Sequence, residues 1–275
     1  MIGRTTVFKD TIAKLSDSAV GKATFLERNP LGYLIASVMA GAYIGLGILL
    51  IFSLGSLLDP TVRPLAMGAA FGLALILVVF AGAELYTSLT MTMMLGRLTG
   101  AVSNRQMARV WALSWVGNLL GALALSAIFV EGGGGVITHA ASEFIYKAAE
   151  TKMHAGAAEL VARAMLCNWL VCLAIWMASR IASETARMIA IAWCLFAFIA
   201  SGYEHSIANM TVFGVALLSP HPEGLNWVGA AWNLGWVTLG NTLAGALFMG
   251  VLPWLASRDW GLPEAAALSA LREEQ

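Results

Sequence analysis

The residues best able to do chemistry in this sequence lie within long apolar runs. Glu84, Glu204 and His205 are the titratable ones with acid–base capacity there. If such a run crosses a bilayer, a charge near its centre costs at least about 2.5–3.5 kcal/mol. Each of the three must therefore be paired, neutral or facing a cavity, and we take them as markers of a functional site.

His205 is the only histidine inside an apolar run, because His139, His154 and His221 fall in expected loops. Its ring titrates near physiological pH, so it can give a passing solute a hydrogen bond or a proton. The alternative is a structural histidine bonded to Glu204 or to an asparagine. The neighbouring glutamate and the expected break in the helix favour contact with solute.

Both glutamates follow a glycine by two positions in an overlong run, after Gly82 and Gly202. This pattern predicts a broken membrane helix, whose unwound backbone is tolerated only where it lines a cavity or packs inside protein. The half-helix after each break begins with free N–H groups and the positive end of a dipole. Such ends bind anions, so the predicted chemistry is recognition of a small anion.

Uncharged polar side chains in the same runs leave two roles open. Thr87 can satisfy freed backbone groups or hydrogen-bond a solute. For Asn168, Asn209, Asn233 and Asn241, bonds between helices are favoured over contact with solute.

Motifs of soluble enzymes are missing from the sequence: it has no GxSxG, HExxH or P-loop and no GxGxxG after a strand. Cys167, Cys172 and Cys194 lie in apolar runs without CxxC spacing, so we expect buried apolar residues, not a metal site or disulfides. We expect no cofactor, no metal and no enzyme activity. An intramembrane enzyme using Glu204 and His205 as acid and base stays open as an alternative.

The elements that must carry these residues are membrane helices. Of the 275 residues, 59% are hydrophobic and 12% charged, about half the charged fraction of soluble domains. Net charge is zero, so no nucleic-acid partner is expected. Six runs can cross a bilayer core of about 30 Å: Leu31–Leu54, Leu65–Gly96, Val110–Val130, Leu160–Ser179, Met188–Ser219 and Trp227–Trp254. The sequence predicts an all-α integral membrane protein.

Three regions follow from these runs: an N-terminal region 1–30, a six-helix membrane domain 31–255 and a tail 256–275. Within the first, Thr6–Phe25 has apolar residues at helical spacing, which predicts an amphipathic helix on the cytoplasmic membrane surface. Anchoring is favoured over gating for it. Twelve basic residues fall on the side of the termini and four on the other, which predicts that both termini are cytoplasmic.

The two halves of the membrane domain resemble each other. Gly82 and Glu84 match Gly202 and Glu204 at an offset of 120, and "GNLLGAL" matches "GNTLAGAL". A repeat of three crossings must insert its second copy upside down, which predicts an inverted 3+3 repeat with a site at the midplane. Chance similarity between apolar helices is the alternative.

The motifs "GAELYTS", "CNWLVCLAIWMA", "GYEHSIANM" and "WNLGWVTLGN" together resemble the formate/nitrite transporter family over essentially the whole membrane region. Overall similarity is greatest to its nitrite-channel branch. The resemblance implies an aquaporin-like fold, and a homopentamer with one pore per protomer in a bacterial inner membrane. It implies passage of nitrite, formate or a related small anion, with membrane lipid around the protein.

The resemblance also implies a substrate pathway of six side chains: His205, Glu204, Thr87, Lys152, Asn168 and Asn209. His205 resembles the central pore histidine, supported by Glu204 and Asn209. Lys152 resembles a buried lysine that makes the site positive, although composition alone makes it a solvated loop residue. The implied constrictions are a cytoplasmic one and a periplasmic one, formed respectively by Leu85 with Phe198 and by Phe71, Leu75 and Val171.

The expected function is therefore a narrow pore in which His205 hydrogen-bonds or protonates a small anion between two apolar constrictions. A channel for a neutral solute such as water or glycerol is the first alternative. Such a channel has no need for a titratable histidine beside a glutamate.

Overall fold

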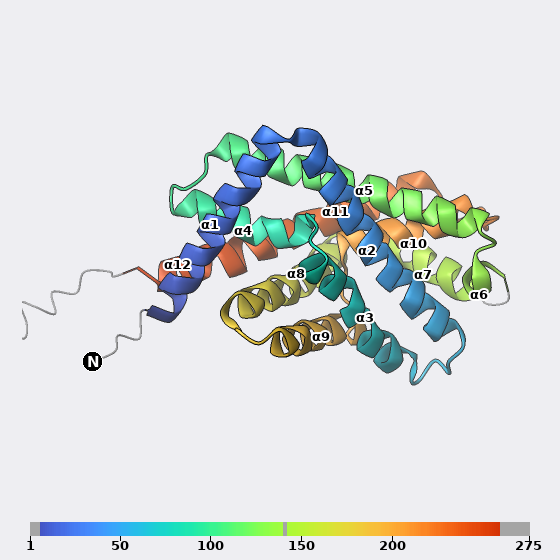
Figure 1. Cartoon of the computed structure of the whole chain (residues 1–275). Coiled ribbons are helices and arrows are strands. Elements are labelled where there is room, and N and C mark those ends of the chain that lie inside the picture. The colour runs from blue at the N-terminus through green and yellow to red at the C-terminus, as the bar shows by residue number, and fades with distance from the viewer. Residues whose placement is uncertain (1–5, 140–141, 259–275) are drawn as a thin grey trace, which may run out of the picture.

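The chain is all-helical wherever its structure is described. The computed structural model describes residues 6–139 and 142–258, and every element within them is a helix. In chain order these are α1 Thr6–Arg28, α2 Pro30–Ser56, α3 Arg63–Phe80, α4 Tyr86–Leu98, α5 Asn104–Glu131, α6 Gly135–Thr138, α7 Ser142–His154, α8 Ala157–Arg180, α9 Glu184–Ala200, α10 Ser206–Leu218, α11 Trp227–Leu243, a π-helical segment Ala244–Val251 and α12 Leu252–Ala256 (Figure 1).

Within the described residues, five stretches of helix are long and apolar enough to cross a membrane: α2, α3, α5, α8 and the continuous helix Trp227–Ala256. The expected fifth crossing, over 188–219, is divided between α9 and α10, which have 17 and 13 residues. The chain is thus a multi-pass membrane protein.

Most of the expected tail 256–275 lies outside the described residues.

Two of the expected crossings are interrupted where the glycines predict it. Helix α3 ends at Phe80 and α4 begins at Tyr86, while α9 ends at Ala200 and α10 begins at Ser206. In Figure 1, α4 and α10 lie on opposite sides of the middle of the molecule. The expectation of two broken helices is met in the described residues.

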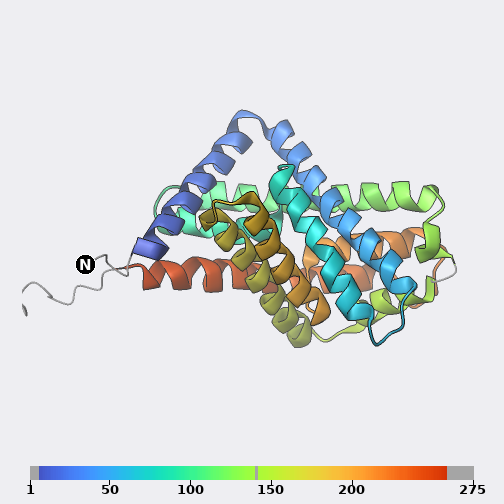
Figure 2. The same ribbon diagram turned by 60° about the horizontal axis from the view of Figure 1, so that its bottom comes forward.

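Helix α1 packs against the rest of the protein. Its buried side chains are Thr11, Ile12, Leu15, Ser16, Ala19, Ala23 and Leu26. They form a buried, mostly apolar face that contacts α4 most, and also α2, α5, α8 and α12. The chain then reverses sharply into α2 (Figure 2), where Pro30 begins the new helix and the Asn29 side chain accepts the Gly32 N–H at 2.8 Å. The apolar face that was expected to lie in the membrane surface instead covers the protein's own helices.

The membrane helices pack in pairs that connect distant parts of the sequence. Contacts are most extensive between α2 and α5, α3 and α9, α2 and α3, and α8 and α11. Small residues allow the close approach: a Cβ on Gly121 would overlap the Val38 carbonyl of α2. The second part of each break, Glu84 with Leu85 and Glu204 with His205, is buried among the helices, whereas Gly82 and Gly202 are exposed.

Candidate functional site

The two breaks have the same backbone construction. Gly82 and Gly202 adopt φ angles of +81° and +70°, in the left-handed region that glycine tolerates best. The N–H one residue later donates to the carbonyl five residues back, from Ala83 to Val78 O at 3.1 Å and from Tyr203 to Phe198 O at 3.0 Å. This is the Schellman pattern of a helix end. The glycine therefore stops each first half-helix in the same way.

A buried ion pair follows each glycine. Glu204 Oε1 accepts from Lys152 Nζ at 2.7 Å, and Glu84 Oε1 accepts from Lys22 Nζ at 2.5 Å. The lysines are 20% and 31% exposed, whereas the glutamate side chains are 4% and 7% exposed. Lys152 lies on α7 and Lys22 on α1, so each break receives its cation from the helix outside the main crossings.

Both carboxylate oxygens of Glu204 accept a hydrogen bond. Asn209 Nδ2 donates to Glu204 Oε2 at 2.6 Å and to Asn233 Oδ1 at 2.9 Å. Asn233 in turn donates to the Lys152 carbonyl at 2.9 Å. Glu84 differs, because its Oε2 is buried without a hydrogen-bond partner. The Lys152–Glu204 pair is thus held more firmly than the Lys22–Glu84 pair.

His205 and Thr87 meet between the two breaks. His205 is the N-cap of α10, and its Nδ1 accepts the Ala208 N–H at 3.1 Å. In the neutral ring the hydrogen therefore lies on Nε2, as assigned from this bonding. Nε2 lies 3.1 Å from the Oγ1 of Thr87, in the first turn of α4. The N-terminal ends of two half-helices are thus joined by one hydrogen bond at 118 residues of separation.

Asn168 lies beside this contact without bonding to His205. Its Nδ2 is near three acceptors: the Thr87 carbonyl at 3.2 Å, Thr90 Oγ1 at 3.1 Å and the Asn241 carbonyl at 2.6 Å. Its Oδ1 is buried and unpartnered. Asn168 therefore bonds the main chain of Thr87, and its own Oδ1 remains a free acceptor.

Two cavities open on either side of the Thr87–His205 contact. We call the first, of about 130 Å³, the Lys152 cavity; Lys152, His205 and Asn209 are among its lining residues. The second, of about 230 Å³, we call the Lys22 cavity; Lys22, Glu84 and Leu85 are among its lining residues. Each cavity has one lysine and a wall that is otherwise mainly apolar.

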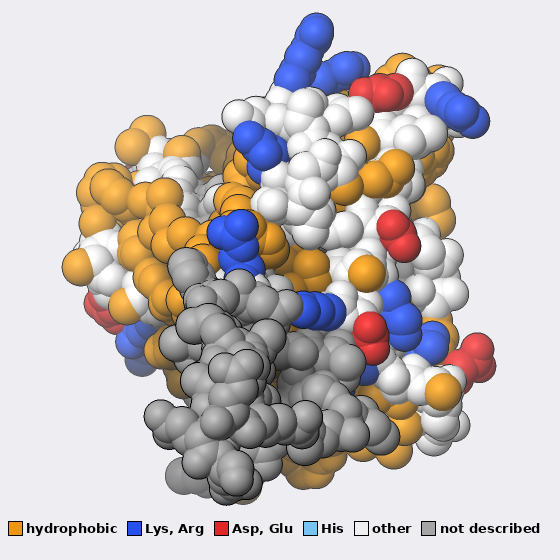
Figure 3. Space-filling model, turned by 90° about the vertical axis from the view of Figure 1, so that its left-hand side faces the viewer, with side chains coloured by type: hydrophobic (Ala, Val, Ile, Leu, Met, Phe, Trp, Pro, Cys, Tyr) orange, Lys and Arg blue, Asp and Glu red, His pale blue; other side chains and the backbone are white. Residues whose placement is uncertain are grey.

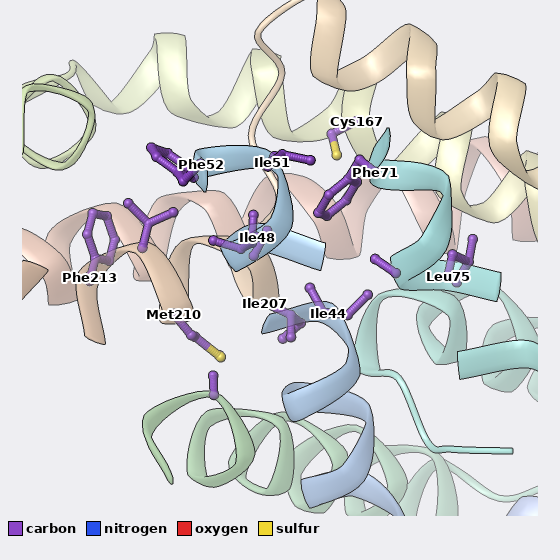
Figure 4. Close-up of a cluster of buried hydrophobic side chains, with 14 of the residues drawn as sticks. Ile44, Ile48, Ile51, Phe52, Phe71, Leu75, Cys167, Ile207, Met210 and Phe213 are labelled. Carbon is purple, nitrogen blue, oxygen red and sulfur yellow. The ribbon is translucent and has the colours of Figure 1, made fainter. Parts of the chain in front are cut away.

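The expected constriction residues are all buried: Phe71, Leu75, Leu85, Val171 and Phe198. Phe198 lies nearly parallel to His205 with ring centroids 6.0 Å apart, and the rings of Phe71 and Phe198 are nearly perpendicular with centroids 5.5 Å apart. Figure 4 shows Phe71 and Leu75 on α3 beside the isoleucines of α2. Phe198 lines the Lys152 cavity and contacts Phe71, whereas Leu85 lines the other cavity.

Comparison with known proteins identifies the family. The family model described as "Formate/nitrite transporter" matches residues 9–255. The chain belongs to the formate/nitrite transporter family. It is 49% identical over 259 residues to the nitrite transporter NirC of Escherichia coli K12, covering 94% of this chain and 96% of that protein. It is 48% identical to NirC of Salmonella typhimurium LT2, covering 96% and 97%.

Solved structures of this family share the fold. A structure described as an FNT family ion channel is 49% identical and superposes with a TM-score of 0.88 over 90% of this chain and 99% of that one. A pentameric formate channel with formate bound is 28% identical, with a TM-score of 0.69 over 82% and 96%.

For this member of the formate/nitrite transporter family, one important residue was missed from the sequence. Lys22 lies within the expected amphipathic segment Thr6–Phe25, whose pattern alone does not indicate a pairing with Glu84. The matched offset of Glu84 and Glu204 was the available signal, since a lysine near one glutamate suggests a lysine near the other. Among the described residues, no group of three metal-ligating side chains exists.

Proposed function

We propose that this protein conducts a small monovalent anion, nitrite first and formate also, across the membrane. The pathway runs from the Lys152 cavity past His205 and Thr87 to the Lys22 cavity. The observation that carries the proposal is the meeting of two half-helix N-termini at these two residues. Both ends direct partial positive charge at one point, which favours an anion there.

Entry at either end is electrostatic. Lys152 and Lys22 place a positive group in each cavity, and the apolar walls strengthen its field. Their glutamate partners offset part of the charge, so an anion is attracted without being trapped. The relatives named nitrite transporters and the formate-bound structure support nitrite and formate as the solutes.

At the centre, His205 offers the anion its Nε2–H while its Nδ1 caps α10. Transfer of that hydrogen to the anion needs a new proton on Nδ1, at the expense of the Ala208 bond. Nitrite then becomes the neutral acid, which avoids the cost of a bare charge in the apolar section. We propose that the apolar section is formed by five buried side chains: Phe71, Leu75, Leu85, Val171 and Phe198.

We further propose a topology of six crossings in an inverted 3+3 repeat, in a pentamer. The matched breaks and the two lysine–glutamate pairs support the repeat, and the pentameric relative supports the assembly. Figure 3 shows Lys and Arg side chains over the face at which α1 and α12 lie, which supports a cytoplasmic position for that face. The bacterial relatives support the inner membrane.

Flux into proteoliposomes tests the proposal. Purified protein should carry nitrite and formate faster than chloride, and an imposed nitrite gradient should give an anion-selective current. Protein-free vesicles are the control. Water or glycerol permeation without anion current would instead establish the neutral-solute channel and reject the proposed function.

A further inference from the structure

Each break is bridged by the side chain of one buried asparagine. Asn241 Oδ1 accepts the Ser206 N–H at 2.9 Å, and its Nδ2 donates to the carbonyls of Glu204 at 3.0 Å and Ala164 at 2.8 Å. Its side chain is fully buried. The two bonded peptide groups at the break stand on either side of His205, so this one side chain sets the direction of the histidine.

The first break has the same device. Asn118 Oδ1 accepts the Tyr86 N–H at 2.9 Å, and its Nδ2 donates to the carbonyls of Glu84 at 2.9 Å and Ser37 at 2.8 Å. The bridged residue is Leu85, and Thr87 follows Tyr86 directly. We call these two arrangements the Asn118 clamp and the Asn241 clamp.

Only an asparagine fits this task among side chains of its size. The clamp uses one acceptor and two donors in a single planar group. Without it, one carbonyl and one N–H at the break lose a partner where water is scarce, which is costly. The bond from the clamp to a carbonyl of a neighbouring helix, Ala164 of α8 or Ser37 of α2, is lost as well. Aspartate keeps the acceptor alone, and leucine keeps none of the three groups.

The Asn241 clamp reaches both members of the central contact. Its main-chain carbonyl accepts from Asn168 at 2.6 Å, and Asn168 also bonds the Thr87 carbonyl. Asn241 is therefore connected to His205 through the adjoining peptides and to Thr87 through Asn168. Hydrogen bonds and the adjoining chain segments thus form a closed ring through Asn241, His205, Thr87 and Asn168. Within it, Thr87 Oγ1 and His205 Nε2 lie 3.1 Å apart.

We propose that Asn118 and Asn241 are positioning residues that fix the Thr87–His205 contact and thereby set which anion passes. This rests on the proposed function, because the contact is taken as the solute site. The clamps touch no solute themselves. They act by holding Leu85 and His205 in extended conformation, with φ angles of −92° and −117°.

Aspartate substitutions test the proposal, since they keep size and acceptor but remove the donors. In Asn241→Asp and in Asn118→Asp, nitrite flux per folded oligomer should fall at least about tenfold because two buried carbonyls lose their donors. Nitrite-over-chloride preference should fall as well. The matched control is Asn226→Asp, whose side chain only accepts, from Gly229 N–H at 2.8 Å; it should stay within about twofold, because aspartate caps helices equally well. Wild-type flux and selectivity in both clamp variants would overturn the proposal.

A second readout does not depend on transport. Nitrogen NMR of ¹⁵N-histidine-labelled protein should show His205 with its hydrogen fixed on Nε2, the signal being assigned by its loss in His205→Asn. In Asn241→Asp that signal should move or broaden; an unchanged signal would overturn the proposal. If wild-type protein conducts no anion, the proposed function fails. The His205 signal in wild type and in Asn241→Asp then still tests whether the clamp positions the histidine. If the aspartate variants do not fold, Asn241→Ser and Asn118→Ser replace them, and failure of these also to assemble would reduce the clamps to folding elements and reject a positioning role.

Discussion

The two ring nitrogens of His205 do different work. Nδ1 belongs to the fold, because it accepts the Ala208 N–H as the cap of α10, while Nε2 faces Thr87 and the proposed solute path. A substitution must therefore preserve the cap if it is to report on the chemistry. Asparagine does so, since it is among the best N-cap residues.

We expect His205→Asn to fold and to conduct nitrite passively, but to lose the stimulation of uptake by external acid. Asparagine keeps an acceptor for the cap and a donor for the anion, yet it cannot exchange a proton near neutral pH. Nitrite uptake is measured across a pH series in purified oligomer, with His154→Asn on the exposed end of α7 as the matched control. A wild-type pH profile in His205→Asn would reject proton transfer and leave hydrogen bonding alone.

The sequence reveals those site residues that differ from their own neighbours, and it does not reveal pairings between distant segments. Glu84, Glu204 and His205 stood out because polar groups in apolar runs are costly. Lys152 came only through the family resemblance, since its own segment is polar. Lys22 lies 62 residues from its partner, and the pattern of its own helix shows nothing of that contact.

Helix α1 contributes a side chain to the proposed site. It supplies Lys22, and its buried face packs on α4, the half-helix that carries Thr87. The sequence showed its amphipathic pattern correctly. That pattern cannot distinguish a lipid surface from a protein surface, because both bury an apolar face.

We expect Lys22→Met to lower stability by about 1–3 kcal/mol, less than a fully buried pair loses because Lys22 is 31% exposed. Lys152→Met should cost less, since Glu204 keeps its Asn209 bond while Glu84 has no second partner. Thermal unfolding in detergent compares the two. The double variant Lys22→Met/Glu84→Gln should recover most of the loss, and equal losses in both single variants would contradict the asymmetry.

Helix α3 presents Phe71 and Leu75 one turn apart on its buried face. Replacing both by alanine should widen the apolar section and raise nitrite flux several-fold, provided that the oligomer assembles. Leu73→Ala on the exposed face of the same helix is the control, and it should leave flux unchanged. Unchanged flux in the assembled double variant would remove these residues from the pathway.

The elements themselves were largely predictable. Apolar length located the membrane helices to within a few residues, and a glycine two positions before a glutamate located both breaks. Which constriction residues lie together was harder to predict, because it depends on contacts between side chains of different helices. Phe198 packs with Phe71 and His205, a contact between α9, α3 and the second break that no local pattern contains.

The two ends of the proposed pathway have the same construction. Each has a lysine–glutamate pair, a glycine-ended half-helix and an asparagine clamp. We therefore expect a solute on this pathway to meet a positive cavity whichever side it comes from. This arrangement favours flow down the gradient in either direction over pumping.

We accordingly expect wild-type protein in a planar bilayer with symmetric nitrite to pass current of both signs, with a nearly linear dependence on voltage. Lys22→Gln should make the current rectify, because one cavity then lacks its attracting cation and draws fewer anions from that side. Raising the ionic strength should reduce the difference between the variant and wild type, since salt screens the lysine field. Lys14→Gln, on an exposed part of α1, is the matched control and should not rectify. Wild-type current in one direction only would contradict this two-ended pathway, while a linear response in Lys22→Gln would show that the Lys22 cavity does not recruit the anion.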